Sequence, residues 1–255
     1  MSIYLSRKNA DEQLNTATLI LGKCEEELGK LPDQSVDFIF TDLPYGTTQC
    51  KWDTPIDLDT LWKEYRRIIK EHGCIALWAQ APFDKILACS NLQMFRYEWI
   101  IEKSKATGFL NSKKMPLKAH ENILIFYKKP PIYHPQMTEG HAPVHSYTKH
   151  TSDGDCYGET KSEISGGGST KRYPRDVLKF AWDTQKSAIH PTQKPVEACK
   201  YMIRTYTDPG ALVLDSCMGS GTTGVAALEI GRNFIGIEKD REIYKNATKR
   251  IEKCI

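Results

Sequence analysis

Short apolar runs of strand length alternate along most of the chain with stretches in which apolar residues recur at helical spacing. Strands are predicted at 36–40, 74–78, 97–102, 122–128 and from Leu212 onward. Helices are predicted after the N-capping candidate Asp57, after Pro82 and over 196–206. With 255 residues, 40% of them hydrophobic, the chain is long enough to bury one substantial α/β core.

This alternation breaks down after Lys128. Prolines and histidines become frequent, and a Ser-Gly-Gly-Gly-Ser sequence occupies 165–169. A stretch this long without periodicity is typical of a functional insertion or of disorder. We therefore predict one main domain, formed by 1–129 and 186–255, which is interrupted by an insertion at 130–185.

The sequence LVLDSCMGSGTTGVAALEIGRNFIGIEKD, over 212–240, predicts a strand, a glycine-rich turn, a helix and a second strand that ends in Glu238. Glycines let the backbone approach a ligand closely, and a carboxylate at this strand end can accept hydrogen bonds from both hydroxyls of a ribose. No GKS or GKT sequence supplies a phosphate-binding lysine, so the pattern favours an adenosine-type ligand without a triphosphate. The alternative is an ordinary strand-to-helix turn, because many α/β proteins make that turn on glycine.

A second candidate site follows the strand at 36–40, where the chain breaks at Asp-Leu-Pro-Tyr, residues 42–45. The break places a carboxylate and an aromatic ring at the carboxyl edge of a sheet, where open α/β folds bind their ligands. The alternative is structural, because Asp-x-Pro is a common turn and Tyr45 is equally suited to cover the core.

Together these segments resemble the amino-group DNA methyltransferases that use S-adenosylmethionine, in their beta class, whose motifs occur in circularly permuted order. DLPY at 42–45 resembles the catalytic tetrad of that family, usually Asp-Pro-Pro-Tyr, and LDSCMGSGTT at 214–223 resembles its methionine-side cofactor motif. HPTQKP at 190–195 is similar to a third cofactor element. HENILIFYKK at 120–129 and RYPRDVL at 172–178 also resemble segments of these enzymes. The resemblance covers nearly the whole chain and is weakest where the family places its sequence-reading segment.

The resemblance implies a Rossmann-like methyltransferase fold: a seven-stranded, mostly parallel sheet with helices on both faces, circularly permuted, with a DNA-reading insertion at 130–185. It implies a site-specific enzyme that flips adenine out of double-stranded DNA and transfers a methyl group directly from S-adenosyl-L-methionine to the exocyclic amine. The alternatives are a cytosine-N4 enzyme, an RNA methyltransferase and a catalytically weak DNA-binding relative. Cytosine is less favoured because family members that act on it commonly begin the tetrad with Ser.

The resemblance assigns catalysis to the four residues of the break: Asp42, Leu43, Pro44 and Tyr45. Asp42 and the Leu43 carbonyl would accept the two amino hydrogens of the base, and Tyr45 would stack on it. Cofactor binding is assigned to residues of the glycine motif, of the second strand end and of the HPTQKP element: Asp215, Met218, Gly219, Ser220, Gly221, Thr222, Thr223, Glu238, His190, Thr192 and Lys194.

Two residues depart from the family pattern. Leu43 stands where the tetrad usually has its first Pro, but the acceptor there is a backbone carbonyl, so the chemistry is preserved. Lys23, in the sequence LGKC, stands where the family often has an Asp that binds the adenine of the cofactor. A lysine side chain cannot accept that hydrogen bond.

DNA binding is predicted in and around the insertion, where basic residues are interleaved with tyrosines. The candidates are Lys128, Lys129, Lys171, Arg172, Tyr173 and Arg175. The formal net charge of +3 permits a nucleic-acid partner without indicating one, and basic runs are also typical of ordinary solvated faces.

The remaining sequence features predict absences. The eight cysteines form no CxxC pair and are expected to be reduced, and His141 and His145 lack a second pair of ligands, so no metal is predicted. No apolar run approaches membrane-spanning length. We therefore expect a cytoplasmic protein, encoded by a bacterium or a phage and associated with the nucleoid through DNA. The resemblance leaves a homodimer and a cognate restriction enzyme open.

Overall fold

The computed structural model describes residues 2–8, 14–46, 55–149, 164–181 and 193–255. The chain divides into two compact units. The larger one is formed by Met1–His134 together with Asp176–Ile255, and the smaller one is Pro135–Arg175. The smaller unit lies inside the predicted insertion at 130–185, and the two ends of that predicted range belong to the larger unit.

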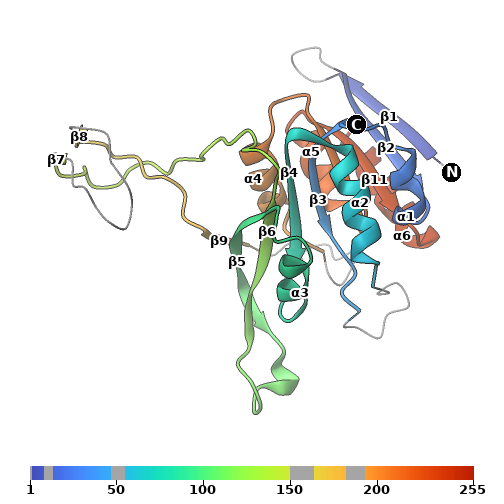
Figure 1. Cartoon of the computed structure of the whole chain (residues 1–255), viewed down its shortest axis with the longest axis horizontal. Helices are drawn as coiled ribbons and strands as arrows, with labels where there is room; N and C mark the ends of the chain where they lie inside the picture. The colour runs from blue at the N-terminus through green and yellow to red at the C-terminus, as the bar shows by residue number, and fades with distance from the viewer. Residues whose placement is uncertain (1, 9–13, 47–54, 150–163, 182–192) are drawn as a thin grey trace. The chain divides into compact units, whose positions relative to one another are not determined.

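The larger unit is built on one twisted sheet, which has nine strands among the described residues (Figure 1). Their order across the sheet is β1 (Ser2–Lys8), β2 (Leu14–Leu21), β11 (Asn233–Glu238), β10 (Leu212–Asp215), β3 (Val36–Asp42), β4 (Ile69–Ala79), β6 (Lys118–Phe126), β5 (Phe95–Thr107) and β9 (Val177–Phe180). The five strands from β2 to β4 are parallel, whereas the pairs β1–β2, β4–β6 and β6–β5 are antiparallel. β9 is parallel to β5. The mostly parallel sheet is confirmed.

The predicted number of seven strands is wrong, because β1 and β9 extend the sheet at its two edges. Neither strand has a fully buried residue among those whose burial is described, since an edge strand needs only one covered face. Ile3 and Leu5 of β1 are half-buried between exposed neighbours, and β9 shows the same alternation. β9 also falls in 176–185, which the sequence pattern placed in the insertion.

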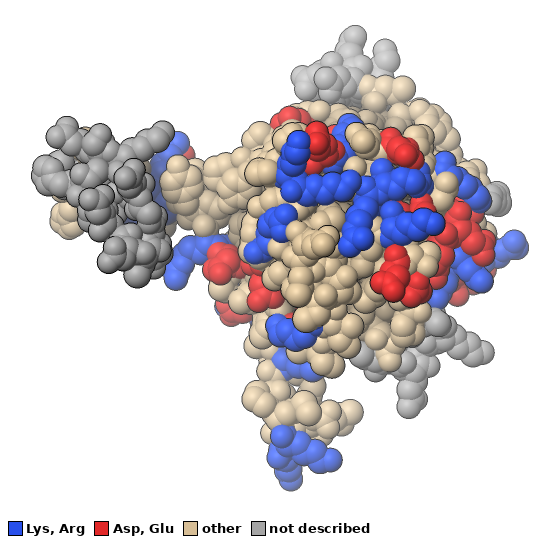
Figure 2. All heavy atoms as spheres, in the orientation of Figure 1, with Lys and Arg blue, Asp and Glu red and all other residues tan. Residues whose placement is uncertain are grey.

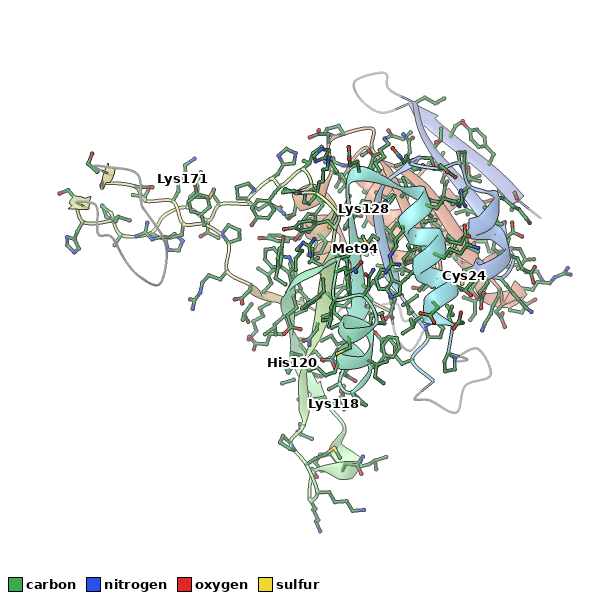
Figure 3. The ribbon with its side chains drawn as sticks, viewed as in Figure 1. Cys24, Met94, Lys118, His120, Lys128 and Lys171 are labelled. Carbon is green, nitrogen blue, oxygen red and sulfur yellow. The ribbon has the colours of Figure 1, made fainter. Side chains whose placement is uncertain are left out.

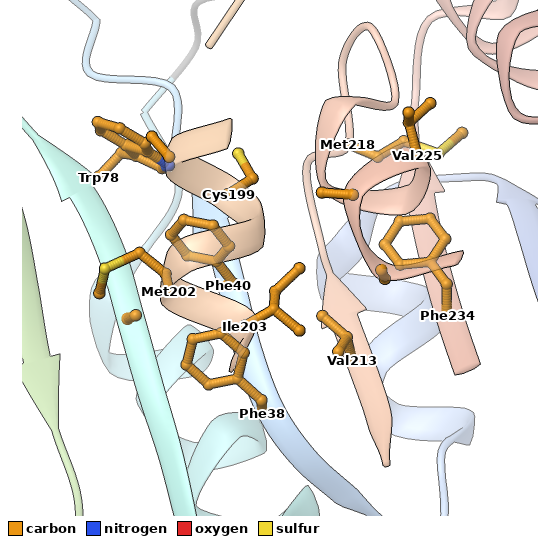
Figure 4. Close-up of a cluster of buried hydrophobic side chains, with 14 of the residues drawn as sticks. Phe38, Phe40, Trp78, Cys199, Met202, Ile203, Val213, Met218, Val225 and Phe234 are labelled. Carbon is orange, nitrogen blue, oxygen red and sulfur yellow. The ribbon is translucent and has the colours of Figure 1, made fainter. Parts of the chain in front are cut away.

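Helices cover both faces of the sheet, as predicted. On one face α4 (Val196–Tyr206), α5 (Thr222–Glu229) and α6 (Arg241–Glu252) pack on a core that contains Phe38, Phe40 and Trp78 (Figure 4). On the other face lie α1 (Cys24–Glu27), the short turn η1 (Leu28–Lys30), α2 (Leu58–Ile68) and α3 (Phe83–Ser90). Two apolar layers therefore enclose the central strands and leave only their ends accessible.

The helix predictions are confirmed in detail. α2 begins after Asp57, whose carboxylate accepts a hydrogen bond from the Thr60 amide at 2.9 Å, and α4 covers the predicted range 196–206. α3 follows Pro82. None of the described helices is long and apolar enough to cross a membrane.

The smaller unit contains a two-stranded antiparallel ribbon, formed by β7 (Tyr147–Lys149) and β8 (Ile164–Gly166). A glycine is required directly after it. Gly167 has φ +154°, and a Cβ atom there would lie 2.5 Å from the Cα atom of Ser146. The glycine-rich sequence thus allows two segments of this unit to approach closely.

Candidate active site

The two candidate segments from the sequence meet at one edge of the sheet. β10 and β3 are adjacent and parallel, with Leu214 opposite Ile39, so their carboxyl ends lie side by side. The Thr41 hydroxyl, near the end of β3, donates a 2.5 Å hydrogen bond to the carboxylate of Asp215 at the end of β10. The tetrad segment and the glycine motif are therefore joined directly, as the predicted common edge requires.

Of the tetrad residues, Leu43 is buried, whereas Asp42 and Tyr45 are partly exposed. Leu43 is buried in the apolar layer beneath α2 and α3, whereas the Asp42 side chain, at the end of β3, is 30% exposed. The Tyr45 hydroxyl donates to Asp42 Oδ1 at 2.5 Å. The Tyr45 ring stacks on Phe83 of α3, with centroids 4.8 Å apart. One carboxylate and one aromatic ring are thus held together at the sheet edge.

The other oxygen of Asp42 faces a buried cation. Lys194 Nζ lies 3.0 Å from Asp42 Oδ2 and 2.7 Å from Glu121 Oε2, and Glu121 Oε1 lies 2.8 Å from Lys103 Nζ. The ammonium of Lys194 also sits over the Trp78 ring, 5.0 Å from its centroid. We call Asp42, Glu121, Lys103 and Lys194 the charge network of the site. The resemblance assigned Lys194 to cofactor binding, and in the structure its ammonium contacts Asp42 of the tetrad.

Burial and ion pairing act in opposite directions on the pKa values of this network. Burial lowers the pKa of Lys194, but Asp42 and Glu121 more than offset it and raise the pKa above its ordinary value. Burial likewise raises the pKa of Glu121, but Lys194 and Lys103 together hold it below the usual range for a glutamate. Both groups are therefore charged at neutral pH.

The glycine turn is accessible at Gly219, which is half-buried, whereas Gly221 is buried. Gly219 and Gly221 have φ values of +48° and +74°, which favour glycine, and Gly221 is the residue before the first turn of α5. Among the described residues, a Cβ atom on Gly219 would meet the Cys217 carbonyl alone, at 3.9 Å, so this part of the structure leaves room there for a ligand to approach. The Met218 side chain, in contrast, is buried in the core, where it packs closely on Gly236.

Glu238 ends β11 directly beside this turn. Its Oε2 accepts a hydrogen bond from the Gly219 amide at 3.0 Å, and its Oε1 accepts one from the Asp240 amide at 2.8 Å. Burial raises the pKa of its carboxyl. Each oxygen of a carboxylate has a second lone pair, so this arrangement orients the group and leaves acceptor capacity toward a diol.

Other predicted cofactor residues form hydrogen bonds with neighbouring residues of the chain. Asp215 is buried and also accepts from the Cys217 amide at 3.1 Å, and burial raises its pKa to about 6. Thr223 is hydrogen-bonded to Asp215. Arg250 of α6 donates to the Ser220 carbonyl at 3.1 Å and to the Thr222 hydroxyl at 2.8 Å. These hydrogen bonds fix the conformation of the glycine turn.

Two predicted cofactor residues, His190 and Thr192, lie outside the described residues. Their neighbour Gln193 is 4% exposed, and its side-chain oxygen has no hydrogen-bond partner among the described residues. The turn at Gly219 and the oriented carboxylate of Glu238 suit a ligand with a diol.

The basic residues predicted to bind DNA occupy different places. Lys128 and Lys129 follow β6, which runs antiparallel to β4, and therefore lie at the opposite edge of the sheet from Asp42. Lys128 donates to the Arg66 carbonyl and Lys129 pairs with Glu71. Figure 3 shows Lys128 and Lys118 near opposite ends of β6. A run of charges in the sequence does not reveal which sheet edge it reaches, and this placement separates the two lysines from the tetrad.

The remaining candidates for DNA binding belong to the smaller unit. Lys171 pairs with Glu139 at 2.7 Å, and the Arg172 guanidinium donates to the Ser169, Lys171 and Ala142 carbonyls. Tyr173 and Arg175 are exposed. The Arg172 side chain thus forms hydrogen bonds within its own unit, while the side chains of Tyr173 and Arg175 are exposed.

Sequence reasoning did not single out several residues at the site: Thr41, Phe83, Glu121, Lys103 and Arg250. Glu121 carried a usable signal, because it lies in the HENILIFYKK segment at 120–129, close to the apolar run at 123–126. The others contact the site only through the sheet order and the helix packing, which the pattern of a single segment does not contain.

The family of the chain is decided by comparison with known proteins. Residues 36–249 match the N6 and N4 DNA methylases. The chain belongs to this family. The methylase is 28% identical over 252 residues to the DNA adenine methyltransferase YhdJ of Escherichia coli (strain K12), across 92% of this chain and 82% of that protein.

Two solved structures have the same fold as the methylase. The M1.HpyAVI-SAM complex aligns with a TM-score of 0.64 and 21% identity, over 92% of this chain and 98% of that one. The cytosine-N4-specific PvuII DNA methyltransferase aligns with a TM-score of 0.65 and 15% identity, over 92% and 86% of the two chains. The predicted Rossmann-like methyltransferase fold is confirmed.

The methylase is thus an S-adenosylmethionine-dependent enzyme that acts on amino groups of DNA bases, as the sequence predicts. Membership does not fix the target base, because the family includes both N6-adenine and N4-cytosine enzymes.

Proposed function

We propose that this methylase transfers a methyl group from S-adenosylmethionine to the exocyclic N6 amine of adenine in duplex DNA. The observation that carries the proposal is the pairing of Asp42 and Tyr45 at the carboxyl end of β3, next to the open glycine turn after β10. A base acceptor and a cofactor site then share one edge of the sheet.

Asp42 would orient the amine. The lone pair of an exocyclic amine is delocalised into the ring, so it must be drawn toward tetrahedral geometry before it attacks a methyl group. Tyr45 and Lys194 each occupy one lone pair of an Asp42 oxygen, and each oxygen keeps another to accept an amino hydrogen. The Leu43 carbonyl accepts the second hydrogen, and the buried Leu43 side chain fixes that carbonyl in place.

Tyr45 would receive the flipped base. Phe83 supports the Tyr45 ring from α3, so the ring is pre-ordered before a base stacks on it. S-adenosylmethionine, when bound, supplies an electrophilic methyl group on a sulfonium. The turn at Gly219 and the carboxylate of Glu238, which the Gly219 amide orients, would hold it at the ends of β10 and β11.

Two observations favour adenine over cytosine. The tetrad begins with Asp rather than with the Ser that commonly accompanies cytosine specificity, and YhdJ, a DNA adenine methyltransferase, is similar over most of the chain. PvuII methyltransferase, which is cytosine-N4-specific, shares the fold at only 15% identity. For the smaller unit we propose target recognition, with Tyr173 and Arg175 as its exposed contacts; the homodimer and the cognate restriction enzyme stay predictions of the resemblance.

Nucleoside analysis tests the target base. The protein is incubated with S-adenosylmethionine and unmethylated genomic DNA, which is then digested and analysed by mass spectrometry. We expect N6-methyladenine. N4-methylcytosine would reassign the base within the same reaction, and the absence of both products from a protein that binds DNA would favour the catalytically weak relative.

The cofactor assignment predicts that Glu238→Ala weakens S-adenosylmethionine binding. The substitution removes acceptors for two ribose hydroxyls and also releases the Gly219 amide, so calorimetry should show a loss of about 1.5 to 3 kcal/mol. Glu242→Ala, an exposed carboxylate in the first turn of α6, is the matched control and should bind normally. Equal affinities for the two variants would remove Glu238 from the site.

A further inference from the structure

β5 and β6 continue as a hairpin well past the rest of the sheet (Figure 1). Within the core, the two strands contribute the fully buried residues Ile101 and Ile123. Beyond the core they stay paired, with Glu102 opposite His120 and Thr107 opposite Lys118. Every residue from 104 to 120 is exposed. We call 104–120 the arm; it ends in the short turn η2 (Phe109–Asn111).

The arm carries charge of one sign. It contains Lys105, Lys113, Lys114 and Lys118 and no Asp or Glu, whereas the chain as a whole has 35 basic and 32 acidic residues. The lysines at its tip are visible in Figure 2 without red neighbours. Apart from Lys118, whose ammonium donates to Gln80 at 3.2 Å, the side chains of these lysines have no ion pair or hydrogen bond recorded within the described part of the chain.

Large apolar side chains stand beside these lysines. Phe109 is 79% exposed and Leu110 is 98% exposed, and Met115 and Leu117 are also exposed. Phe109 and Leu110, two adjacent apolar side chains at the end of a projecting hairpin, are thus left largely uncovered by the described residues. An exposed group of this kind marks a surface that contacts a partner.

The arm starts at the catalytic edge. Trp78 of β4 is opposite both Asp42 of β3 and Ile123 of β6, so the first residues of β6 lie at the same edge as the tetrad. Glu121, directly after the arm, pairs with Lys194, which contacts Asp42. A substrate that places one base at Asp42 therefore has its neighbouring residues within reach of the arm.

We propose that the arm binds duplex DNA beside the target base: its lysines contact phosphates, while Phe109 and Leu110 contact bases that become unstacked when the target is flipped. The inference rests on the proposed function for its partner. DNA fits the arm because it supplies closely spaced negative charge together with apolar base faces. Apolar side chains that enter a disrupted base stack are an established mode of DNA contact.

The test of the lysines is a salt titration. Lys105→Ala, Lys113→Ala and Lys114→Ala are combined, and binding to a fluorescent mixed-sequence duplex is followed by anisotropy. We expect a weaker Kd and a salt slope lower by about 2 to 3, since each phosphate contact contributes about 0.9. The control combines Lys245→Ala, Lys249→Ala and Lys253→Ala, which are exposed on or directly after α6 and should leave the slope unchanged. An unchanged slope for the arm variant, or an equal fall in the control, overturns the proposal.

The test of the apolar tip is a second variant, Phe109→Ser with Leu110→Ser. We expect methyl transfer in a single turnover to slow about tenfold or more, with a smaller change in salt slope than the lysine variant shows. Because these side chains are exposed, the variant should fold and bind S-adenosylmethionine normally. A loss of self-association with unchanged DNA binding and transfer would instead make the tip an interface between copies and overturn the proposal. DNA binding is measured without catalysis, so failure of the arm and failure of the proposed methyl transfer are distinguishable.

Discussion

Asp42→Ala should yield a folded protein that binds S-adenosylmethionine and has lost methyl transfer to DNA. The Asp42 side chain is partly exposed at a strand end, and Lys194 keeps Glu121 as a counterion, so the fold should persist. The acceptor that matters as charge develops on the nitrogen is gone, which is expected to lower kcat by about 10²–10³-fold or more. Transfer of a labelled methyl group in a single turnover measures the loss.

Three variants make this prediction specific. Asp59→Ala removes an exposed carboxylate from α2 and should keep full activity. Tyr45→Phe loses the hydrogen bond to Asp42 but keeps the ring that stacks on Phe83, so it should retain much of the activity, whereas Tyr45→Ala should lose it. If Asp42→Ala unfolds the protein, or methylates at close to the wild-type rate, residues 42–45 are a structural turn.

Lys194→Met should destabilise the protein strongly as well as reduce its activity. The substitution leaves Asp42 without a cation and the largely buried Glu121 with Lys103 alone, and removal of one partner of a buried ion pair costs about 3–5 kcal/mol. Urea denaturation followed by circular dichroism measures the change. Activity should fall because Asp42 loses the contact that fixes its Oδ2.

Lys200→Met is the matched control, in α4 six residues further along. Lys200 pairs with Glu197 and Glu229, which are both largely exposed, and such pairs are worth about 0–1 kcal/mol. Adding Asp42→Asn to Lys194→Met should restore part of the stability, since it removes the charge that is left without a cation, while Glu121 still pairs with Lys103. Equal destabilisation by the two lysine substitutions would show that the charge network contributes no more than a surface pair.

The sequence predicted the elements that carry a strong periodic signal. β3, β10 and β11 are apolar runs with clear ends, and the motifs directly after them lie where open α/β sheets bind ligands. The sequence did not predict β1, β9 or the arm, because edge strands and projecting hairpins bury few apolar side chains. Their sequences therefore lack the continuous apolar pattern that marks a central strand.

The contacts within the site were harder to predict. Asp42, Glu121 and Lys194 lie on segments more than 70 residues apart, and Glu121 approaches Asp42 only because β4 is flanked by β3 on one side and β6 on the other. The same order explains why Lys128, seven residues after Glu121, reaches the opposite edge. Local patterns gave the candidate residues, and sheet order decided which of them act together.

The charge network has a consequence for how a polyanion reaches this edge. Two carboxylates at a catalytic edge would repel the phosphates of DNA, yet Asp42 and Glu121 are each within 3.0 Å of a lysine ammonium. The two carboxylates and the two ammonium groups have a net charge of zero. At the distance of a DNA phosphate, the electric field of the two ion pairs has fallen off steeply and is screened by salt. A base can therefore meet a full negative charge at hydrogen-bonding distance, while the strand that carries it encounters an electrically neutral site.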